Sequence, residues 1–325
     1  MKPHAPETGT IPEVARFHDS ITRTLGSLIV GNRELIELII IALLAEGHIL
    51  IEGVPGTAKT TIAKAVARAT NCQFNRIQGA VDLQPADLIG IKTYDTISRS
   101  FTLRKGPIFT NILLADEINR INPKSQGAFI EAMSEQQATI DGETCRIASP
   151  FLVIATQNPY DLHGTFPLIE AQRDRFMFGL TSGHLNSDEE LDLVRRASVG
   201  KLDWDGYSRS VPLENTRENL LSLIRTVNTV RIEEPVLAYI RDIVIATRKN
   251  GNIELGASSR ASVAFVRGAK AHAALTKRPF VLPDDVKVLA DAILCHRIIL
   301  TREAEVENIK PEDVVREILE TIEVP

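Results

Sequence analysis

The chain has 325 residues, 44% of them hydrophobic, so it can form a large core and, by its length, two domains. Its net charge of −5 gives no support to a function in nucleic-acid binding, although short basic stretches occur. The three cysteines (Cys72, Cys145 and Cys295) lack the spacing of zinc sites or disulfide frameworks, which favours a reducing, cytoplasmic compartment.

The amino-terminal half predicts short apolar strands that alternate with helices. Residues 1–10 are polar, and we expect them to form a flexible terminus rather than a signal peptide. The most apolar run, 38–45, is too short to span a bilayer, so we expect no membrane insertion. Helices are predicted within 11–26, 29–47, 59–70 and 123–136, strands within 48–52, 73–78, 112–116 and 151–159, and a hairpin around "DG" within 137–147.

Continuous apolar strands between helices are typical of a parallel sheet covered on both faces, that is, an αβα sandwich of the α/β class. After about residue 185 the pattern changes to helical periods within 213–227, 234–250, 259–275, 283–297 and 310–322. We therefore predict an α/β domain over 11–187, a helix and linker over 188–211, and an all-helical domain over 212–325.

The stretch "ILIEGVPGTAKTTIAKAVA" has the order strand, glycine turn, Lys-Thr, helix. Backbone N–H groups of such a turn and the positive end of the helix dipole can bind phosphates. Lys59 would reach the β- and γ-phosphates of a nucleotide, and Thr60 would bind Mg²⁺. Ala58 replaces the last glycine of the usual phosphate-loop pattern, and we expect it to keep a negative φ and begin the helix. The alternative interpretation is an ordinary glycine turn between a strand and a helix.

The stretch "NILLADEINR" places two acids at the end of a predicted strand. Asp116 would hold Mg²⁺, mostly through water, and Glu117 would orient and polarise the attacking water. Without the upstream Lys-Thr pair, two surface charges would explain the motif equally well.

A third predicted strand, "FLVIATQNP", ends at Asn158. A polar group there could position water beside the γ-phosphate and sense hydrolysis. Taken alone, Asn158 followed by proline would more simply start a turn.

With these parts in order, the chain resembles the MoxR family of AAA+ ATPases, which belongs to the class with an insert in helix 2. The resemblance covers nearly the whole chain and rests on "IVGNREL", "LIEGVPGTAKT", "GPIFTNILLADEINR", "PKSQGAFIEAMSEQQATIDG", "FLVIATQNP", "GTFPLIEAQRDRF" and "GASSRAS". Alanine before the loop lysine is characteristic of this family. The resemblance implies that 11–187 is the nucleotide-binding domain and 212–325 its lid. It also implies that 87–107 holds the helix-2 insert and that the 137–147 hairpin precedes the sensor strand.

The resemblance also implies roles for individual residues. Asn158 would be sensor 1, Arg260 sensor 2 on the lid, and Arg175 the arginine finger that reaches a neighbouring subunit. Arg173, where leucine is common, leaves the choice of finger open, and an ion pair with Glu170 or Asp174 is the alternative for either arginine. The nucleotide-binding residues, for ATP or ADP, would be Val30, Gly31, Gly53, Val54, Pro55, Gly56, Thr57, Ala58, Lys59, Thr60, Thr61, Asp116 and Arg260.

The favoured function is an ATP-hydrolysing ring, expected to be hexameric, that remodels or activates a client protein. The resemblance adds a partner with a von Willebrand factor A domain. A nucleotide-gated scaffold with little turnover is the alternative from another class. Metal insertion and DNA unwinding are related roles that the sequence does not favour, because no metal-ligand segment and no global positive charge support them.

Overall fold

A computed structural model of the chain describes residues 9–325 except 55, 98, 160–163, 203–205, 207 and 209–214. Its centre is a sheet of five parallel strands in the order β2-β5-β8-β1-β9. The strands are β1 (Ile49–Gly53), β2 (Phe74–Gln78), β5 (Ile112–Asp116), β8 (Leu152–Gln157) and β9 (Phe178–Ser182). The parallel α/β sheet is thus confirmed, whereas β9, which forms one edge of the sheet, was not predicted from the sequence.

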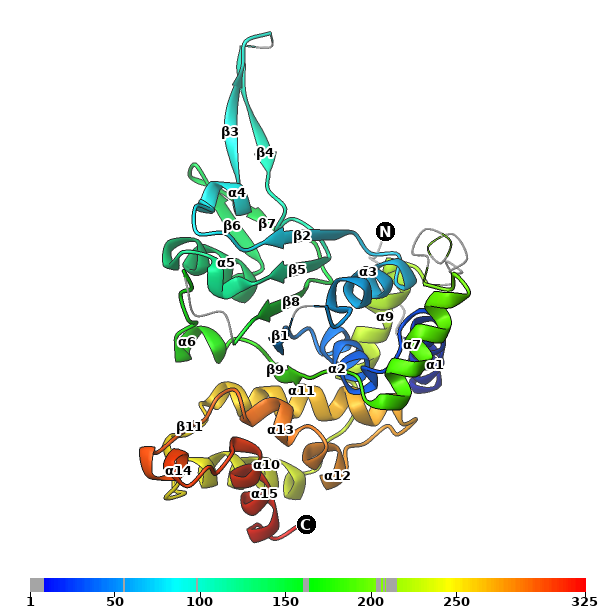
Figure 1. Ribbon diagram of the computed structural model, residues 1–325, viewed down its shortest axis with the longest axis vertical. Helices are drawn as coiled ribbons and strands as arrows, with labels where there is room; N and C mark the ends of the chain where they lie inside the picture. The colour runs from blue at the N-terminus through cyan, green and yellow to red at the C-terminus, as the bar shows by residue number, and fades with distance from the viewer. Residues whose placement is uncertain are drawn as a thin grey trace, which may run out of the picture.

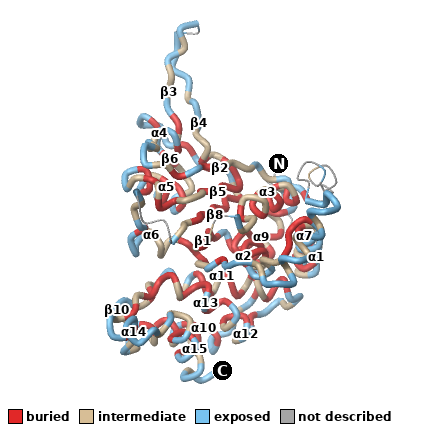
Figure 2. Tube along the Cα trace, in the orientation of Figure 1, coloured by how far each residue is buried: buried red, intermediate tan, exposed pale blue. Residues whose placement is uncertain are grey.

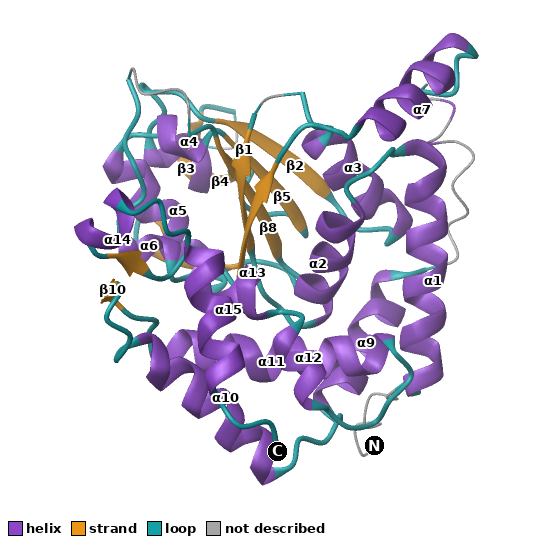
Figure 3. Cartoon of the chain, turned by 60° about the horizontal axis from the view of Figure 1, so that its bottom comes forward, coloured by secondary structure: helices purple, strands orange, loops and turns teal. Residues whose placement is uncertain are grey.

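Successive residues of the strands point to opposite faces of the sheet, and each face has its own apolar cluster. Ile49 and Ile51 of β1 pack with one cluster, and Leu50 packs with the other. Figure 3 shows the strands side by side between the two groups of helices. The first face is covered by α1 (Ile11–Leu28), α2 (Arg33–Leu44) and α3 (Lys59–Ala69), and the second by α4 (Pro85–Ile89), the 3₁₀ turn η1 (Ile118–Arg120) and α5 (Pro123–Glu135). Figure 2 shows the buried residues concentrated in these strands and helices.

The carboxy-terminal part is helical and lies against one edge of the sheet domain (Figure 1). Its elements are α9 (Arg217–Asn228), α10 (Glu234–Thr247), α11 (Ser259–Leu275), α12 (Pro283–Lys287), α13 (Ala290–Leu294), α14 (Arg302–Val306) and α15 (Pro311–Thr321). A short antiparallel pair, β10 (Ile253–Leu255) and β11 (Ile299–Leu300), joins them. The predicted helix over 283–297 is divided into α12 and α13, which are separated by a turn. Buried apolar residues of α11 belong to the same cluster as those of α1 and α2, so the two parts share one core.

Two antiparallel hairpins extend the sheet domain. The longer one, β3 (Gly90–Asp95) and β4 (Ser100–Lys105), projects away from the body of the molecule (Figure 1). The shorter one, β6 (Gln137–Ile140) and β7 (Glu143–Arg146), is the predicted "DG" hairpin. Lys92 joins the two: its backbone N–H donates to Asp141 (3.1 Å), and its Nζ lies 3.1 Å from Glu143.

Two further helices, α6 (Glu170–Arg173) and α7 (Ser187–Ser198), lie on either side of β9 along the chain. Most of the expected terminus 1–10 and much of the linker after α7 lie outside the described residues. Within the described part of the chain, no helix combines the length and the apolar character needed to cross a bilayer.

One fully buried carboxylate organises the helical part. Asp285 accepts hydrogen bonds from Arg278 Nη2 (2.6 Å) and from the backbone N–H of Leu282 (2.7 Å), and it lies 2.6 Å from His272 Nδ1. Burial alone would raise the pKa of Asp285, but the hydrogen bonds from His272 and Arg278 outweigh it and lower the pKa to about 2. Asp285 is therefore ionised at neutral pH.

Replacing this carboxylate should destabilise the helical part. We expect Asp285→Asn to lower the free energy of unfolding by about 3 kcal/mol, because Arg278 would lose its buried counter-ion. Urea denaturation followed by circular dichroism measures this. The neighbouring Asp284, whose side chain is 83% exposed, provides the control, and Asp284→Asn should change stability by less than about 0.5 kcal/mol. An equal loss of stability in the two variants would contradict the structural role of Asp285 as the buried partner of Arg278.

Candidate nucleotide-binding site

A glycine turn links the carboxyl end of β1 to the start of α3. Gly53, the last residue of β1, has φ of 156°, and a Cβ built on it would lie 2.2 Å from the carbonyl oxygen of Ser182 in β9. Only glycine tolerates this approach of two backbones. Gly56 has φ of 88°, also in the region that favours glycine. Pro55 lies outside the described residues.

Ala58 differs from the prediction. Its φ is 58°, in the left-handed region, so the expectation of a negative φ is wrong. Ala58 is the N-cap of α3, and its carbonyl oxygen accepts the hydrogen bond from the Ile62 N–H (2.9 Å). The turn needs a left-handed residue here to direct the chain into the helix, and alanine adopts that conformation at a cost of about 1–2 kcal/mol. With Ala58, the loop thus has the same left-handed backbone conformation that a glycine at this position would adopt.

Lys59 is the first residue of α3, and its side chain folds back over the loop. Its Nζ donates to the carbonyl oxygens of Gly53 (3.1 Å) and Val54 (2.8 Å). The residue is only 8% exposed, and burial lowers its pKa although the nearby Asp116 raises it. A buried cation is thus held at the mouth of the turn.

The two acids follow β5 at the same edge of the sheet. Asp116 accepts hydrogen bonds from Arg76 Nη2 (2.8 Å) and Thr156 Oγ1 (2.6 Å). Glu117 has φ of 54°, so the chain turns sharply after the strand. Its carboxylate accepts a hydrogen bond from Gln78 Nε2 (3.1 Å). Neighbouring strands therefore fix the position of both acids.

These groups surround one pocket of about 420 Å³ at the carboxyl edge of the sheet, where α/β folds bind ligands. Asn158, which follows β8, lines the same pocket. Its carbonyl oxygen accepts from Asn119 Nδ2 (3.3 Å), which anchors the loop after the strand. The structure thus brings together residues from four strand ends and one helix start: Gly53, Gly56, Thr57, Ala58, Lys59, Thr60, Thr61, Arg76, Gln78, Asp116, Glu117, Thr156, Gln157 and Asn158.

A second pocket of about 330 Å³ adjoins the first and shares Gly56, Thr57, Ala58 and Thr61 with it. Its walls are mainly apolar and include Val30, one of the expected nucleotide-binding residues, together with residues around α7. A Cβ on Gly31 would lie 2.7 Å from Leu185 and 2.9 Å from Glu189, so this glycine allows the segment before α7 to pack closely. A polar pocket at the strand ends and a more apolar pocket beside it thus share the wall formed by the glycine turn.

The predicted arginines lie elsewhere. Arg175 and Arg260 line a separate pocket of about 490 Å³ with Arg267 and Arg297. Glu46, Gly47 and His48, which precede β1, also line it, so it lies at the amino edge of the sheet. Arg260 is paired with Asp174 (3.2 Å). Within one chain, therefore, the structure does not bring Arg260 to the loop of Lys59.

Arg173 and Arg175 point in different directions. Arg175 donates a hydrogen bond to Ser134 at the amino edge. Arg173 instead lines a third pocket, between the sheet and the helical part. Asp174, the alternative ion-pair partner for these arginines, accepts from Ser258 (2.8 Å), Arg260 and Arg297 (3.1 Å).

Sequence reasoning missed several residues of the site. Arg76 and Gln78 lie two residues apart on β2 and contact Asp116 and Glu117, respectively. Their spacing puts them on one face of a strand, which could have indicated a polar wall. Thr156, buried near the end of β8, donates to Asp116, but an isolated threonine in an apolar strand gives no such signal.

The glycine turn, the buried lysine and the acids at the ends of parallel strands are features of a P-loop nucleotide-binding fold. In agreement, residues 48–178 match the family model "ATPase family associated with various cellular activities", and residues 245–318 match the AAA lid domain. The crystal structure of a candidate ATPase from Cytophaga hutchinsonii aligns with a TM-score of 0.89 and 38% identity over 97% of each chain.

Three similar proteins show to which family of AAA ATPases the chain belongs. The chain is 42% identical to the uncharacterised protein YeaC of Bacillus subtilis, covering 93% of this chain and 92% of that protein. It is 37% identical to Chaperone MoxR1 of Mycobacterium tuberculosis (92% and 80%) and 26% identical to Protein MoxR of Methylorubrum extorquens (96% and 95%). The chain belongs to the MoxR family of AAA+ ATPases.

Substitution by glycine tests the left-handed conformation of Ala58, because its effect on the free energy of unfolding should be opposite at Ala58 and in the middle of α3. Ala58→Gly should raise the free energy of unfolding by about 1 kcal/mol, because glycine adopts a positive φ without strain. Ala63→Gly, in the middle of α3, should instead lower it by about 1 kcal/mol. Thermal denaturation of both variants is the measurement. Destabilisation by Ala58→Gly as large as that by Ala63→Gly would contradict the left-handed assignment.

Proposed function

We propose that this chain is an ATP-hydrolysing motor that assembles into a ring and uses hydrolysis to remodel or activate a client protein. The convergence of Lys59, Asp116, Glu117 and Asn158 on one pocket carries the proposal. A site that only binds nucleotide would need the loop but would have no use for the acid and amide at the strand ends.

The residues of the loop would bind the phosphates of ATP or ADP. The first N–H groups of α3 have no acceptor within the helix, and the helix dipole adds partial positive charge there. Lys59 would exchange its carbonyl partners for phosphate oxygens. The hydroxyl of Thr60 and the carboxylate of Asp116 are oxygen ligands that suit Mg²⁺, which would neutralise charge on the phosphates.

Glu117 is the proposed acceptor for the proton of the attacking water. Its partners, Gln78 and Arg120 (Nη1 at 3.4 Å), hold the carboxylate in one orientation at the pocket wall. Asn158, at the end of the neighbouring strand β8, would hold the same water. Fixed partners reduce the reorganisation needed in the transition state.

Charge that develops on the transferred phosphoryl group needs further cations. Arg175 and Arg260 are at the amino edge of the sheet, and the phosphate pocket is at its carboxyl edge. Both arginines would therefore act on the nucleotide of a neighbouring subunit. A head-to-tail contact of this kind closes into a ring when its rotation permits, and we propose a hexamer.

The β3–β4 hairpin offers a surface for the client. Tyr94 (53% exposed) and Phe101 (71%) are cross-strand partners, and Ile97 at the tip is 94% exposed. Large exposed apolar side chains on a projecting hairpin are typical of protein contacts. The family further favours a partner with a von Willebrand factor A domain. The unpaired cysteines agree with a cytoplasmic location.

Removing the proposed base should abolish turnover but preserve binding. Glu117→Gln should lower the rate of phosphate release by about 10²-fold or more and change ATP affinity by less than about threefold. Phosphate release and fluorescent-nucleotide titration measure the two effects, and Glu131→Gln on the exposed face of α5 serves as control. A near-wild-type rate would contradict the hydrolytic assignment. Negligible wild-type turnover at every protein concentration would favour the nucleotide-gated scaffold.

Mixing two inactive variants tests whether the finger acts between subunits. Arg175→Ala lacks the finger and Glu117→Gln lacks the base, so each variant alone should be inactive. In an equimolar mixture, about a quarter of the sites would combine an intact base with a neighbour's intact finger, and activity should return to about that level. The same experiment with Arg173→Ala is the control, since it tests the other arginine. No recovery with Arg175→Ala would contradict a role in trans.

A further inference from the structure

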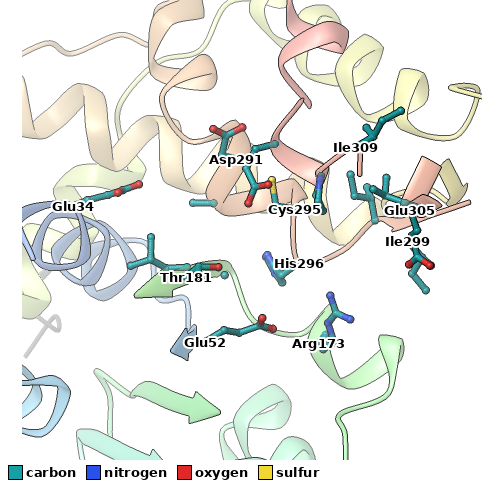
Figure 4. A pocket seen from close by; sticks show the side chains of 17 residues that line it. Glu34, Glu52, Arg173, Thr181, Asp291, Cys295, His296, Ile299, Glu305 and Ile309 are labelled. Atoms are coloured by element: carbon teal, nitrogen blue, oxygen red, sulfur yellow. The ribbon is translucent and has the colours of Figure 1, made fainter. Parts of the chain in front are cut away.

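Arg76 on β2 is a cation of the nucleotide pocket that has no part in the proposed phosphate binding or hydrolysis. Among the described residues that line this pocket, the charged ones are Lys59, Arg76, Asp116 and Glu117. Glu52, at the end of β1, belongs to a different space, because it lines the larger pocket between the sheet and the helical part that Figure 4 shows. The charges of the nucleotide pocket are therefore balanced, and half of its positive charge comes from Arg76.

Arg76 is fixed on one oxygen of Asp116. Its Nε and Nη2 donate to Oδ2 at 3.2 and 2.8 Å, and Thr156 Oγ1 donates to the other oxygen, Oδ1, at 2.6 Å. Hydrogen bonds between a guanidinium and a carboxylate are stronger than neutral ones, and the two charges offset each other. The carboxylate that is expected to hold Mg²⁺ therefore already has a cation beside it.

The same guanidinium reaches the second acid through Gln78. Arg76 Nη2 donates to Gln78 Oε1 (2.5 Å), and Gln78 Nε2 donates to Glu117 Oε2 (3.1 Å). Because Arg76 binds the amide oxygen, the amide nitrogen is held toward the carboxylate of Glu117. One side chain thus connects the proposed metal ligand with the proposed base.

The two cations of the pocket differ in burial. Lys59 is 8% exposed and donates to two carbonyl oxygens, whereas the side chain of Arg76 is 45% exposed. An exposed guanidinium can turn into solvent without leaving a buried, unpaired charge. Asp116 would keep its position, because the hydroxyl of Thr156 holds its other oxygen. The ion pair of Arg76 and Asp116 can therefore open while the rest of the pocket keeps its geometry.

We propose that Arg76 is the counter-ion of Asp116 in the metal-free site and competes with Mg²⁺ for this carboxylate. The inference rests on the proposed function, in which Asp116 is a metal ligand. A guanidinium and a divalent cation at one carboxylate repel each other, so Arg76 has to leave Oδ2 when the metal site is filled. Its departure also removes the partner of Gln78 Oε1 and frees the amide that holds Glu117. Arg76 is thus a positioning residue through which the base responds to the metal.

Binding of ADP with and without Mg²⁺ tests the competition, and it involves no turnover. In Arg76→Gln, the affinity for a fluorescent ADP analogue in EDTA should fall by about tenfold or more, because the bare carboxylate of Asp116 would repel the phosphates. At saturating Mg²⁺ the affinity should stay within about threefold of wild type. The Mg²⁺ concentration at half effect should fall by about tenfold, since the competing cation is gone.

Two variants control for the loss of charge. Arg76→Lys keeps the positive charge and should keep the Mg²⁺ dependence of wild type within about threefold. Lys124→Gln, at an exposed position at the start of α5, removes a positive charge outside the pocket and should behave as wild type. Equal weakening of ADP binding by Arg76→Gln with and without Mg²⁺ would overturn the inference, because a distorted loop gives that result. Unchanged binding in both conditions would overturn it as well.

A double-mutant cycle shows whether Arg76 acts through Asp116. Asp116→Asn has no carboxylate charge to offset, so adding Arg76→Gln to it should change the ADP affinity in EDTA by less than about threefold. A loss of about tenfold in this background too would overturn the inference, because Arg76 would then act on the phosphates directly.

The same binding curves separate this inference from the proposed function. If Asp116→Asn loses the effect of Mg²⁺ on ADP affinity while Arg76→Gln leaves that effect unchanged, the competition is wrong and the metal site stands. If Asp116→Asn keeps the full effect of Mg²⁺, the assignment of Asp116 as a metal ligand fails, and with it this part of the proposed function.

Discussion

The buried guanidinium of Arg297 holds the two parts of the molecule together. Its side chain is 2% exposed, and it donates to Asp174 (3.1 Å) and to the carbonyl oxygens of Met177 (3.0 Å) and Phe176. Burial lowers its pKa to about 10 although Asp174 opposes this, so the charge remains at neutral pH. A buried cation is tolerated only where its donors are satisfied, and here the acceptors come from the segment just before β9. The helical part is therefore fixed to the sheet domain at one charged point as well as by apolar packing.

Asp174 connects the buried Arg297 to residues at the amino edge of the sheet. It shares its carboxylate among Arg297, Ser258 and Arg260, so one group both fixes the lid and positions an exposed arginine. The residues proposed to bind phosphate and to act as the base lie at the carboxyl edge of the sheet, and the proposed finger and sensor arginines lie at the amino edge. Arg260, expected among the nucleotide-binding residues, therefore lies away from Lys59, and Arg175, expected to reach a neighbouring subunit, lines the same pocket as Arg260.

Features that depend on residues close together along the chain could be predicted from the sequence, whereas features that depend on long-range pairing could not. Periodic apolar runs identified four strands of the sheet and most helices, because hydrophobic spacing is a local property. The edge strand β9 was missed, because its short sequence Phe178–Ser182 is half polar and its pairing with β1 is long-range. Lys59, Asp116 and Glu117 could be predicted from motif order, whereas Arg76 and Thr156 could not, because only the pairing of β2, β5 and β8 brings them to Asp116. The φ of Ala58 does not follow from the residue preference of alanine, because the geometry of the turn overrides that preference.

The connection of the two hairpins has a mechanical consequence. The β6–β7 hairpin immediately precedes β8, the strand that leads to Asn158, and Lys92 fixes it to the root of β3. Each strand of the long hairpin has six residues, so its tip lies about 20 Å from that root. A rotation of about 10° at the root of an arm of this length would displace the tip by about 3.5 Å. The β3–β4 hairpin, which carries the exposed aromatic side chains at a distance from the body, is thus connected through the β6–β7 hairpin to β8, the strand beside the nucleotide pocket.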